Sequence, residues 1–260
     1  MQTDRFLLTS MPVVGGTGLG PLLSARQGLR LLLCPPDDAF TNMALDEALA
    51  LTADITPTFR VYYWSSPSIS IGYFQKVLEV LNAPVPVGAG FKPAPTIVRR
   101  PTGGTAVLHL PETYQPSFSL VIETPRSMGQ IYHLLGQVAI EALKTLDIEA
   151  RLWDEKGSRG RFQTCPYFCT SNFSHYDVIS QGQKVAGYSA RRLQGVTLFQ
   201  GYLHLPEPAK GGHLVEAIIT GMEKIAGVRL MEGNLTEAEA VLTRELRQKK
   251  YLQQDWNYKR

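Results

Sequence analysis

The chain has 260 residues, of which 44% are hydrophobic, 19% charged and 9% aromatic, and this ordinary composition excludes disorder as the main state. The formal net charge is only +3, whereas dedicated nucleic-acid binders carry a larger, clustered excess of Lys and Arg. No apolar run approaches the roughly 20 residues that span a bilayer, so we expect no membrane segment.

The first third of the chain opens with a poorly periodic stretch, and we predict a flexible N-terminal segment over residues 1–27. Its glycine cluster, GGTGLG from Gly15, lacks the spacing of a phosphate-binding loop, and no clear strand precedes it. The N-terminus also lacks the continuous apolar region of a secretory signal. Apolar patterning then predicts, in order, a strand at 29–34, a helix at 41–51, and strands at 59–64 and 68–73.

Strands dominate the middle of the chain. A Pro-rich stretch at 83–95 is typical of a surface loop. Alternation and short apolar runs predict strands at 96–100, 106–110, 117–122 and 196–205, and a hairpin of 176–179 with 183–187. One amphipathic stripe predicts a helix over 130–146.

The last 50 residues shift to helical patterning. A helix is predicted at 214–225, and TEAE from Thr236 is a capping box that opens another. Strands and helices follow one another without regular βαβ alternation, which favours an α+β fold with mixed, mostly antiparallel sheets packed against helices. We expect a catalytic-type domain over 28–207 and a short helical extension over 208–260 packed on it.

The three cysteines, Cys34, Cys165 and Cys169, are few and odd in number, so they cannot make a disulfide framework. This indicates a reducing, cytoplasmic location. Cys34 lies in an apolar run and is predicted to be a core thiol. Cys169 is surrounded by small polar residues, so it is either an accessible nucleophile or an idle half-buried thiol. A zinc site is not expected, because the histidines do not supply two further ligands at suitable spacing.

Two further segments attract attention. RRPTGGT from Arg99 places two glycines between two strands, either as a tight hairpin turn with surface arginines or as a close approach to a ligand. In GQKVAG from Gly182, Lys184 stands among residues expected to point inward. It either has a buried partner or extends from a strand edge to solvent.

Five motifs together resemble the lipoate–protein ligase and octanoyltransferase family, whose fold is shared with biotin protein ligases. They are NMALDEA from Asn42, RVYYW from Arg60, GYFQ from Gly72, RRPTGGTAVLH from Arg99 and GQKVAGYSARR from Gly182. The resemblance is greatest to the LipM-type octanoyltransferase branch, because Cys169 stands seven residues before Tyr176, Thr105 replaces a third glycine, and the C-terminal tail is short.

This resemblance implies transfer of an octanoyl group from acyl carrier protein to a lysine of a lipoyl domain or of the glycine-cleavage H protein. Cys169 would form an enzyme thioester, and Lys184 would favour the thiolate or bind the acyl carbonyl. No cofactor is required, since the thioester is the donor. We expect no nucleic acid, membrane or metal partner, and a monomer.

The resemblance also implies a substrate-binding set. Arg99 and Arg100 are expected to steer an acidic carrier protein, and the turn is expected to border the acyl pocket. The full set is Tyr73, Arg99, Arg100, Thr102, Gly103, Gly104, Thr105, His109, Gly187 and Tyr188.

Three places depart from the family pattern. After Gly187 the chain has Tyr188, Ser189 and Ala190 where relatives read Ser-Ala-Gln, and QGY, ending at Tyr202, stands where relatives often read His-Gly-Ser. The segment LPETYQPSFSLVI after His109 is three residues longer than the compact version in relatives. Two tyrosines in place of small residues predict a narrower or reshaped pocket. Three alternatives stay open: an ATP-dependent lipoate ligase, an amidotransferase with the same cysteine chemistry, and a non-catalytic lipoyl-domain-binding homologue.

Overall fold

The computed structural model describes residues 28–52, 56–83, 94–111, 115–124, 127–153, 166–205 and 213–259. The predictions for the N-terminal segment with its glycine cluster, for most of the 83–95 loop and for Cys165 therefore lie outside the described residues.

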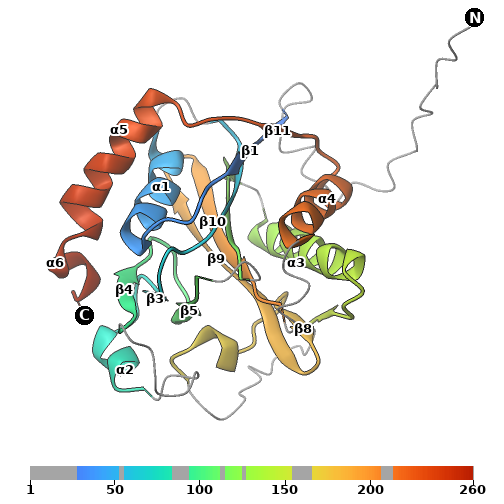
Figure 1. Ribbon diagram of the computed structural model, residues 1–260, viewed down its shortest axis with the longest axis horizontal. Coiled ribbons are helices and arrows are strands. Elements are labelled where there is room, and N and C mark those ends of the chain that lie inside the picture. Colours follow the sequence, from blue (N-terminus) through green and yellow to red (C-terminus); the bar gives the residue numbers. More distant parts are fainter. Residues whose placement is uncertain are drawn as a thin grey trace, which may run out of the picture.

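Two sheets form the centre of the part of the chain that the structure describes (Figure 1). The larger has eight strands in the order β11-β1-β2-β6-β10-β9-β8-β7. β11, β1 and β2 run parallel, and the other neighbouring pairs are antiparallel. The strand bounds are β1 Leu29–Leu33, β2 Thr58–Tyr62, β6 Ser117–Glu123, β7 Arg151–Leu152, β8 Val178–Ser180, β9 Gln183–Leu193, β10 Val196–Leu203 and β11 Leu230–Glu232.

The smaller sheet has three strands in the order β4-β3-β5. Their bounds are β3 Ser68–Ile71, β4 Thr96–Arg99 and β5 Val107–His109. β3 pairs parallel with β4 and antiparallel with β5, so β4 and β5 lie on opposite sides of β3. The hairpin interpretation of the PTGG turn is therefore wrong, because the loop crosses the end of β3 instead of joining paired neighbours.

Helices cover both faces of the larger sheet (Figure 1). α3 and α4 pack together on one face, and α1 packs on the other with α5 outside it. The helix bounds are α1 Ala39–Leu51, α2 Val77–Leu81, α3 Met128–Thr145, α4 Leu214–Ala226, α5 Glu237–Leu246 and α6 Gln254–Asn257, with a π-helical turn, η3, at Arg247–Tyr251.

Strand alternation explains the two-sided core. On β6, Phe118, Leu120 and Ile122 enter the cluster under α3 and α4, whereas Val121 enters the cluster under α1. Successive side chains of a strand point to opposite faces, so one strand supplies both cores. The face toward α1 also receives the serines Ser117 and Ser119, which leaves room there for polar contacts.

Local signals explain the helix boundaries. The Asp38 side chain accepts hydrogen bonds from the N–H groups of Phe40 and Thr41, so α1 begins at Ala39, two residues before the predicted start. The predicted capping box is confirmed, since Thr236 and Glu239 exchange both hydrogen bonds. α4 ends at Gly227, whose φ of 63° is a left-handed cap.

The predicted α+β class with mixed, mostly antiparallel sheets is confirmed. The division at residues 207 and 208 stays a prediction. The structure places β11 from beyond that point beside β1 as an edge strand of the larger sheet, and α4 against α3. Sequence patterning missed α2, η3 and α6, which are all shorter than two helical turns.

Candidate active site

Strands of both sheets line a cavity that has about 430 Å³ of empty space, counting its open mouth. The lining residues are Met43, Tyr62, Trp64, Ser70, Arg100, Gly104, Val107, His109, Ser117, Cys169, Gly187, Tyr188, Ser189, Gln200, Gly201 and Tyr202.

Cys169 begins a 3-10 turn, η1 (Cys169–Ser171), at the edge of this cavity. Its backbone N–H donates to the Ala106 carbonyl at 2.7 Å, and the Ala106 N–H donates to the Tyr167 carbonyl at 2.9 Å. These bonds join the turn to the end of the glycine loop. The half-buried thiol therefore has a fixed backbone beneath it.

Lys184 reaches Cys169 from β9 and is buried. Its Nζ lies 3.1 Å from the Cys169 Sγ, 3.1 Å from the Asn172 carbonyl oxygen and 2.5 Å from Asp177 Oδ2. An ammonium group has three donors, and these three partners use them all. Of the two interpretations of Lys184, a buried partner is the correct one.

Charge balance in this corner depends on the lysine having two neighbours. Burial alone lowers the pKa of Lys184, but Cys169 and Asp177 together raise it above its ordinary value. Burial raises the pKa of Asp177, and the ion pair with Lys184 offsets only part of that rise. Of the two groups, Lys184 is thus held more strongly in its charged form, because a Cys169 thiolate would stabilise the ammonium in addition to Asp177.

Arg99 does not lie at the surface. Its side chain is fully buried, and its guanidinium donates to the backbone carbonyls of Gly72, Tyr73, Gln75, Trp256 and Asn257. The expectation that Arg99 steers a carrier protein is therefore wrong. The residue holds the C-terminal α6 against the loop that follows β3.

Arg100 is also buried, so a surface steering role is wrong for it as well. It lines the cavity, but its N–H groups donate to Ser70, to the Gly103 carbonyl and to the Thr105 carbonyl. Arg100 fixes the curve of the glycine loop from inside. In the sequence, two adjacent arginines before a turn suggest surface charge, whereas here the carbonyl oxygens of a tight loop accept the hydrogen bonds of Arg100 inside the protein.

The glycine loop approaches β3 closely. A Cβ on Gly72 would lie 1.8 Å from the Gly104 carbonyl oxygen, and Gly104 has a φ of +88°. Gly104 lines the cavity, as predicted, while Thr102, Gly103 and Thr105 are outside its lining. Thr102 instead lies behind it, 2.8 Å from the Ser189 hydroxyl and hydrogen-bonded to Gln200 at 2.6 Å.

Tyr73 was expected at the pocket but is not among its lining residues. Its ring packs edge-on against Phe74 and Trp256, beneath the cations of Arg191 and Lys259. These aromatic and cation–π contacts hold the ring toward the C-terminal segment. By contrast His109, Gly187 and Tyr188 do line the cavity.

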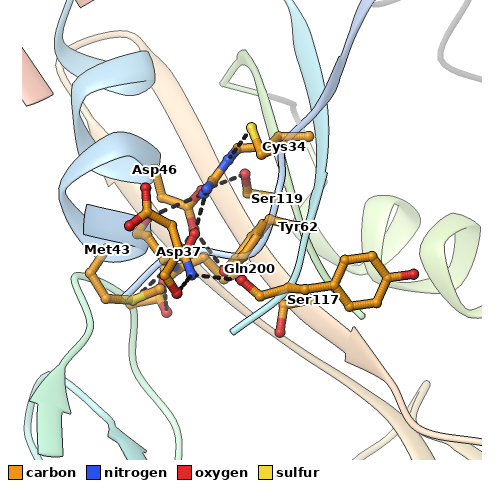
Figure 2. A network of polar contacts seen from close by, with 12 residues as sticks. Cys34, Asp37, Met43, Asp46, Tyr62, Ser117, Ser119 and Gln200 are labelled. Carbon is orange, nitrogen blue, oxygen red and sulfur yellow. Dashed lines mark hydrogen bonds and ion pairs between the residues drawn. The ribbon is translucent and has the colours of Figure 1, made fainter. Parts of the chain in front are cut away.

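A closed polar network forms the cavity wall toward α1, as Figure 2 shows around Asp46. The buried Asp46 carboxylate accepts hydrogen bonds from Arg60, Tyr62, Ser119 and Gln200 at 2.6–3.0 Å. Gln200, one of the family departures, is thus a strut between Asp46 and the glycine loop.

Cys34 belongs to the same network rather than to a purely apolar core. It is half-buried, and its Sγ lies 3.2 Å from Arg60 Nε. The prediction of a simple core thiol is therefore corrected. An apolar run in the sequence gives no sign of the arginine that approaches from the neighbouring strand.

Two buried polar atoms at the cavity lack a hydrogen-bond partner among the described residues. They are the Tyr202 hydroxyl and His109 Nδ1. The other ring nitrogen of His109 lies 2.8 Å from the Ser70 hydroxyl, and the ring stacks on Trp64. Buried polar groups are normally paired, so unpaired ones that line a cavity indicate where a ligand binds.

Sequence reasoning missed the role of Asp177 and of the Asn172 carbonyl. Asp177 follows Cys169 by eight residues in the sequence, and a buried lysine demands an anionic partner nearby. Within the described ranges, no group of three or more His, Cys, Asp and Glu residues is arranged to hold a metal ion. None of the helices in those ranges is long and apolar enough to cross a membrane.

Comparison with known proteins places this geometry in a family. Residues 38–210 match the model of the lipoyl protein ligase A/B catalytic domain. The octanoyltransferase LipM of Kyrpidia tusciae is 30% identical, with 90% of this chain and 100% of the relative covered. That of Anoxybacillus flavithermus is also 30% identical, over 84% of this chain and 94% of the relative.

Solved structures support the fold. A lipoate-protein ligase A bound with ATP aligns with a TM-score of 0.70 at 21% identity, covering 89% of this chain and 99% of that one. A protein from T. acidophilum with bound lipoic acid also gives 0.70 at 22% identity, covering 90% and 100%. The resemblance drawn from the five sequence motifs is confirmed, and the chain belongs to the lipoyl protein ligase A/B catalytic-domain family.

Proposed function

We propose that this enzyme transfers an octanoyl group from the thioester of an acyl carrier protein to a lysine of a lipoyl domain or of the glycine-cleavage H protein. The acyl group would pass through a thioester on Cys169. The observation that carries the proposal is the 3.1 Å contact between Lys184 Nζ and Cys169 Sγ at the edge of the cavity.

The curated relatives named above support the choice of acyl group, since they are octanoyltransferases. A cysteine nucleophile supports transfer over ligation, because a thiolate can exchange one thioester for another without activation by ATP. The donor thioester carries the free energy of the reaction, so no further cofactor enters this scheme. ATP would be needed only by a ligase.

The chemistry follows from the corner around Cys169. The Lys184 ammonium faces the sulfur and favours its anionic form, which is the nucleophile. Asp177 neutralises part of the buried charge and holds the amine in place. The apolar surfaces of Val107 and Tyr188 line the same cavity and are suited to an alkyl chain.

Intact-protein mass spectrometry tests the proposal. Incubation with octanoyl-carrier protein should add one octanoyl group to the enzyme, and neutral hydroxylamine should remove it, because it cleaves thioesters. Cys169→Ala should show no adduct. Cys34→Ala and Cys165→Ala are matched controls and should both be acylated like wild type.

A second assay addresses the rival reaction. ATP-dependent release of pyrophosphate with free lipoate would identify a ligase and overturn the transferase proposal. An adduct that persists in Cys169→Ala would show that another residue is the nucleophile. Acylation of the enzyme without transfer to either acceptor protein would overturn the assignment of the acceptor.

A further inference from the structure

We propose that the Tyr202 hydroxyl donates the hydrogen bond that stabilises the oxyanion formed when Cys169 attacks a thioester. This role rests on the proposed function and assigns it a further catalytic residue.

The register of two strands brings the hydroxyl to the reactive corner. Tyr202 on β10 pairs with Gly187 on β9. A Cβ on Gly187 would lie 3.3 Å from the Tyr202 hydroxyl and 3.0 Å from Lys184 Nζ, so both groups share the space that the missing side chain leaves. The cavity lining includes both Tyr202 and Cys169.

The cationic groups near the sulfur are already committed. Lys184 uses its three donors on Cys169, Asn172 and Asp177, and it lies outside the cavity lining. Arg100 lines the cavity, but each of its guanidinium nitrogens donates to the glycine loop or to Ser70. Either cation would have to give up an existing bond to stabilise an oxyanion.

The backbone N–H of the nucleophile itself is already committed. Acyltransfer enzymes often use the N–H group of the nucleophile or its neighbour for the oxyanion. Here the Cys169 N–H donates to the Ala106 carbonyl at 2.7 Å. The Tyr202 hydroxyl, in contrast, is buried at the cavity without a partner of suitable geometry in the described part of the chain.

The hydroxyl also keeps its proton. Burial first, then the charges of the nearby Cys169 and Asp177 and a contact of the hydroxyl with the Cys169 sulfur, raise the pKa of Tyr202 well above its ordinary value, so the hydroxyl stays protonated at neutral pH. His109 Nδ1 is the other unpartnered atom of the lining, but its ring stacks on Trp64 and lies beside Ser70, whereas Tyr202 lies beside Gly187 and Lys184. Tyr202 is therefore the better placed of the two.

The step balances without an additional reactant. The Cys169 thiolate forms a bond to the carbonyl carbon, the π electrons move to the oxygen, and this oxyanion accepts the hydrogen bond from Tyr202. Collapse breaks the bond to the carrier sulfur, which leaves as a thiolate. The acceptor amine later repeats the attack and expels Cys169. The proton that the amine loses equals the one that the carrier thiol gains.

Tyr202→Phe removes only the hydroxyl, and single-turnover acylation by octanoyl-carrier protein is the measurement. We expect acylation to slow roughly 10²-fold, the lower end of what loss of one oxyanion donor costs. The pH midpoint for alkylation of Cys169 by iodoacetamide should change far less than the acylation rate, because the thiolate keeps Lys184. Tyr251→Phe is a matched control, since Tyr251 is fully buried but hydrogen-bonds Glu47, outside the cavity.

Three results overturn the inference. Acylation of Tyr202→Phe within threefold of wild type would do so while leaving Cys169 catalysis intact. A shifted alkylation midpoint with an equal loss of rate would assign Tyr202 to the thiolate instead. Absence of any adduct on wild type would remove the proposed function and this inference with it.

A second variant keeps the test decisive if Tyr202→Phe fails to fold by circular dichroism. Incorporation of 3-fluorotyrosine at position 202 keeps the ring and the hydroxyl but makes the hydroxyl a stronger donor. Acylation should then be faster, and the infrared carbonyl frequency of the acyl-enzyme should fall. An unchanged rate and frequency would contradict the hydrogen bond.

Discussion

The wall around Asp46 and the corner around Cys169 both combine buried charge with the same cavity, yet they are built differently. At the wall, the Asp46 carboxylate has four side-chain partners, and Arg60 completes its own set with Asn42 and Cys34. At the corner, a lysine is saturated while the adjacent Tyr202 hydroxyl has no described partner.

This difference separates scaffold from reactive surface. A fully paired buried network fixes one geometry and loses much when any member is removed. An unpaired buried donor costs free energy in the unliganded protein and regains it when a ligand supplies the acceptor. We therefore expect substitutions at the wall to reduce stability with little effect on the acylation rate, and substitutions at the corner to reduce the acylation rate strongly.

Lys184→Met should give the largest effect. It removes the cation beside Cys169 while keeping most of the side-chain volume, and we expect acylation to fall roughly 10³-fold. Stability should also fall by about 3–5 kcal/mol, because the variant leaves Asp177 buried and unpaired. Single-turnover kinetics and urea unfolding measure the two losses separately.

The double variant Lys184→Met/Asp177→Asn separates the loss of acylation rate from the loss of stability. It removes the orphaned charge, so most of the lost stability should return while acylation stays slow. If the second substitution restored the rate as well, the effect of Lys184 on acylation would come from folding alone.

Asp46→Ala should break the wall. It leaves the Arg60 guanidinium buried without its carboxylate, and we expect a loss of about 3–5 kcal/mol in the free energy of unfolding. The acylation rate of the folded fraction should change less than tenfold. Glu141→Ala breaks an ion pair with the largely exposed Lys224 and should cost less than about 1 kcal/mol. Similar losses of stability in Asp46→Ala and Glu141→Ala would show that the buried network around Asp46 contributes no more to stability than an exposed ion pair does.

The fold class could be predicted because strand alternation and helical periodicity are local patterns. The pairing of Cys169 with Lys184 could be predicted because five motifs follow one another in the order of a known family. Alternation along 117–122 and the stripe over 130–146 survive as β6 and α3 with small shifts at their ends. Arg99 and Arg100 show what local patterns omit. Their partners are carbonyl oxygens brought close only by the tertiary structure.

The same reason explains Asp177, Tyr73 and Tyr202. The Lys184–Asp177 pair needs the hairpin of β8 and β9, and the place of Tyr73 depends on a C-terminal helix of four residues that has no periodic signal. The two tyrosine departures were visible in the sequence as larger side chains near a pocket. Which one carries an unpaired hydroxyl depends on strand register, because Tyr188 donates to the Leu135 carbonyl.

Buried histidines near the corner predict a pH dependence of stability. Burial lowers the pKa of His204 to about 4, against about 6.5 in an unfolded chain. Between these values the unfolded state binds a proton that the folded state does not, so stability falls as the pH drops from 6.5 to 4. The loss approaches about 3 kcal/mol per such histidine.

Urea unfolding at pH 7, 6 and 5 checks this dependence, and His204→Gln should make it shallower. A residual slope is expected, because burial also lowers the pKa of His109 well below its ordinary value. An identical slope in wild type and His204→Gln would show that His204 becomes charged in the folded protein. The corner would then hold a cation besides Lys184 at mildly acidic pH.

Tyr188→Ala should change selectivity rather than rate. The Tyr188 ring lines the cavity beside Phe118. Replacing this ring with a methyl group should make room for a longer acyl tail. One additional methylene in an apolar pocket is worth roughly 1–3 kcal/mol, so dodecanoyl-carrier protein should gain at least about tenfold relative to octanoyl. Competition between the two donors, read from the masses of the acyl-enzymes, measures the ratio.

Tyr188→Phe is the matched variant, because it keeps the ring and loses only the hydrogen bond to Leu135. Its chain-length preference should equal that of wild type. If Tyr188→Ala also kept the wild-type preference, the acyl tail would have to run along the other side of the cavity, past Tyr62 and Trp64. The paired wall would then contact substrate, and the division between scaffold and reactive surface would fail there.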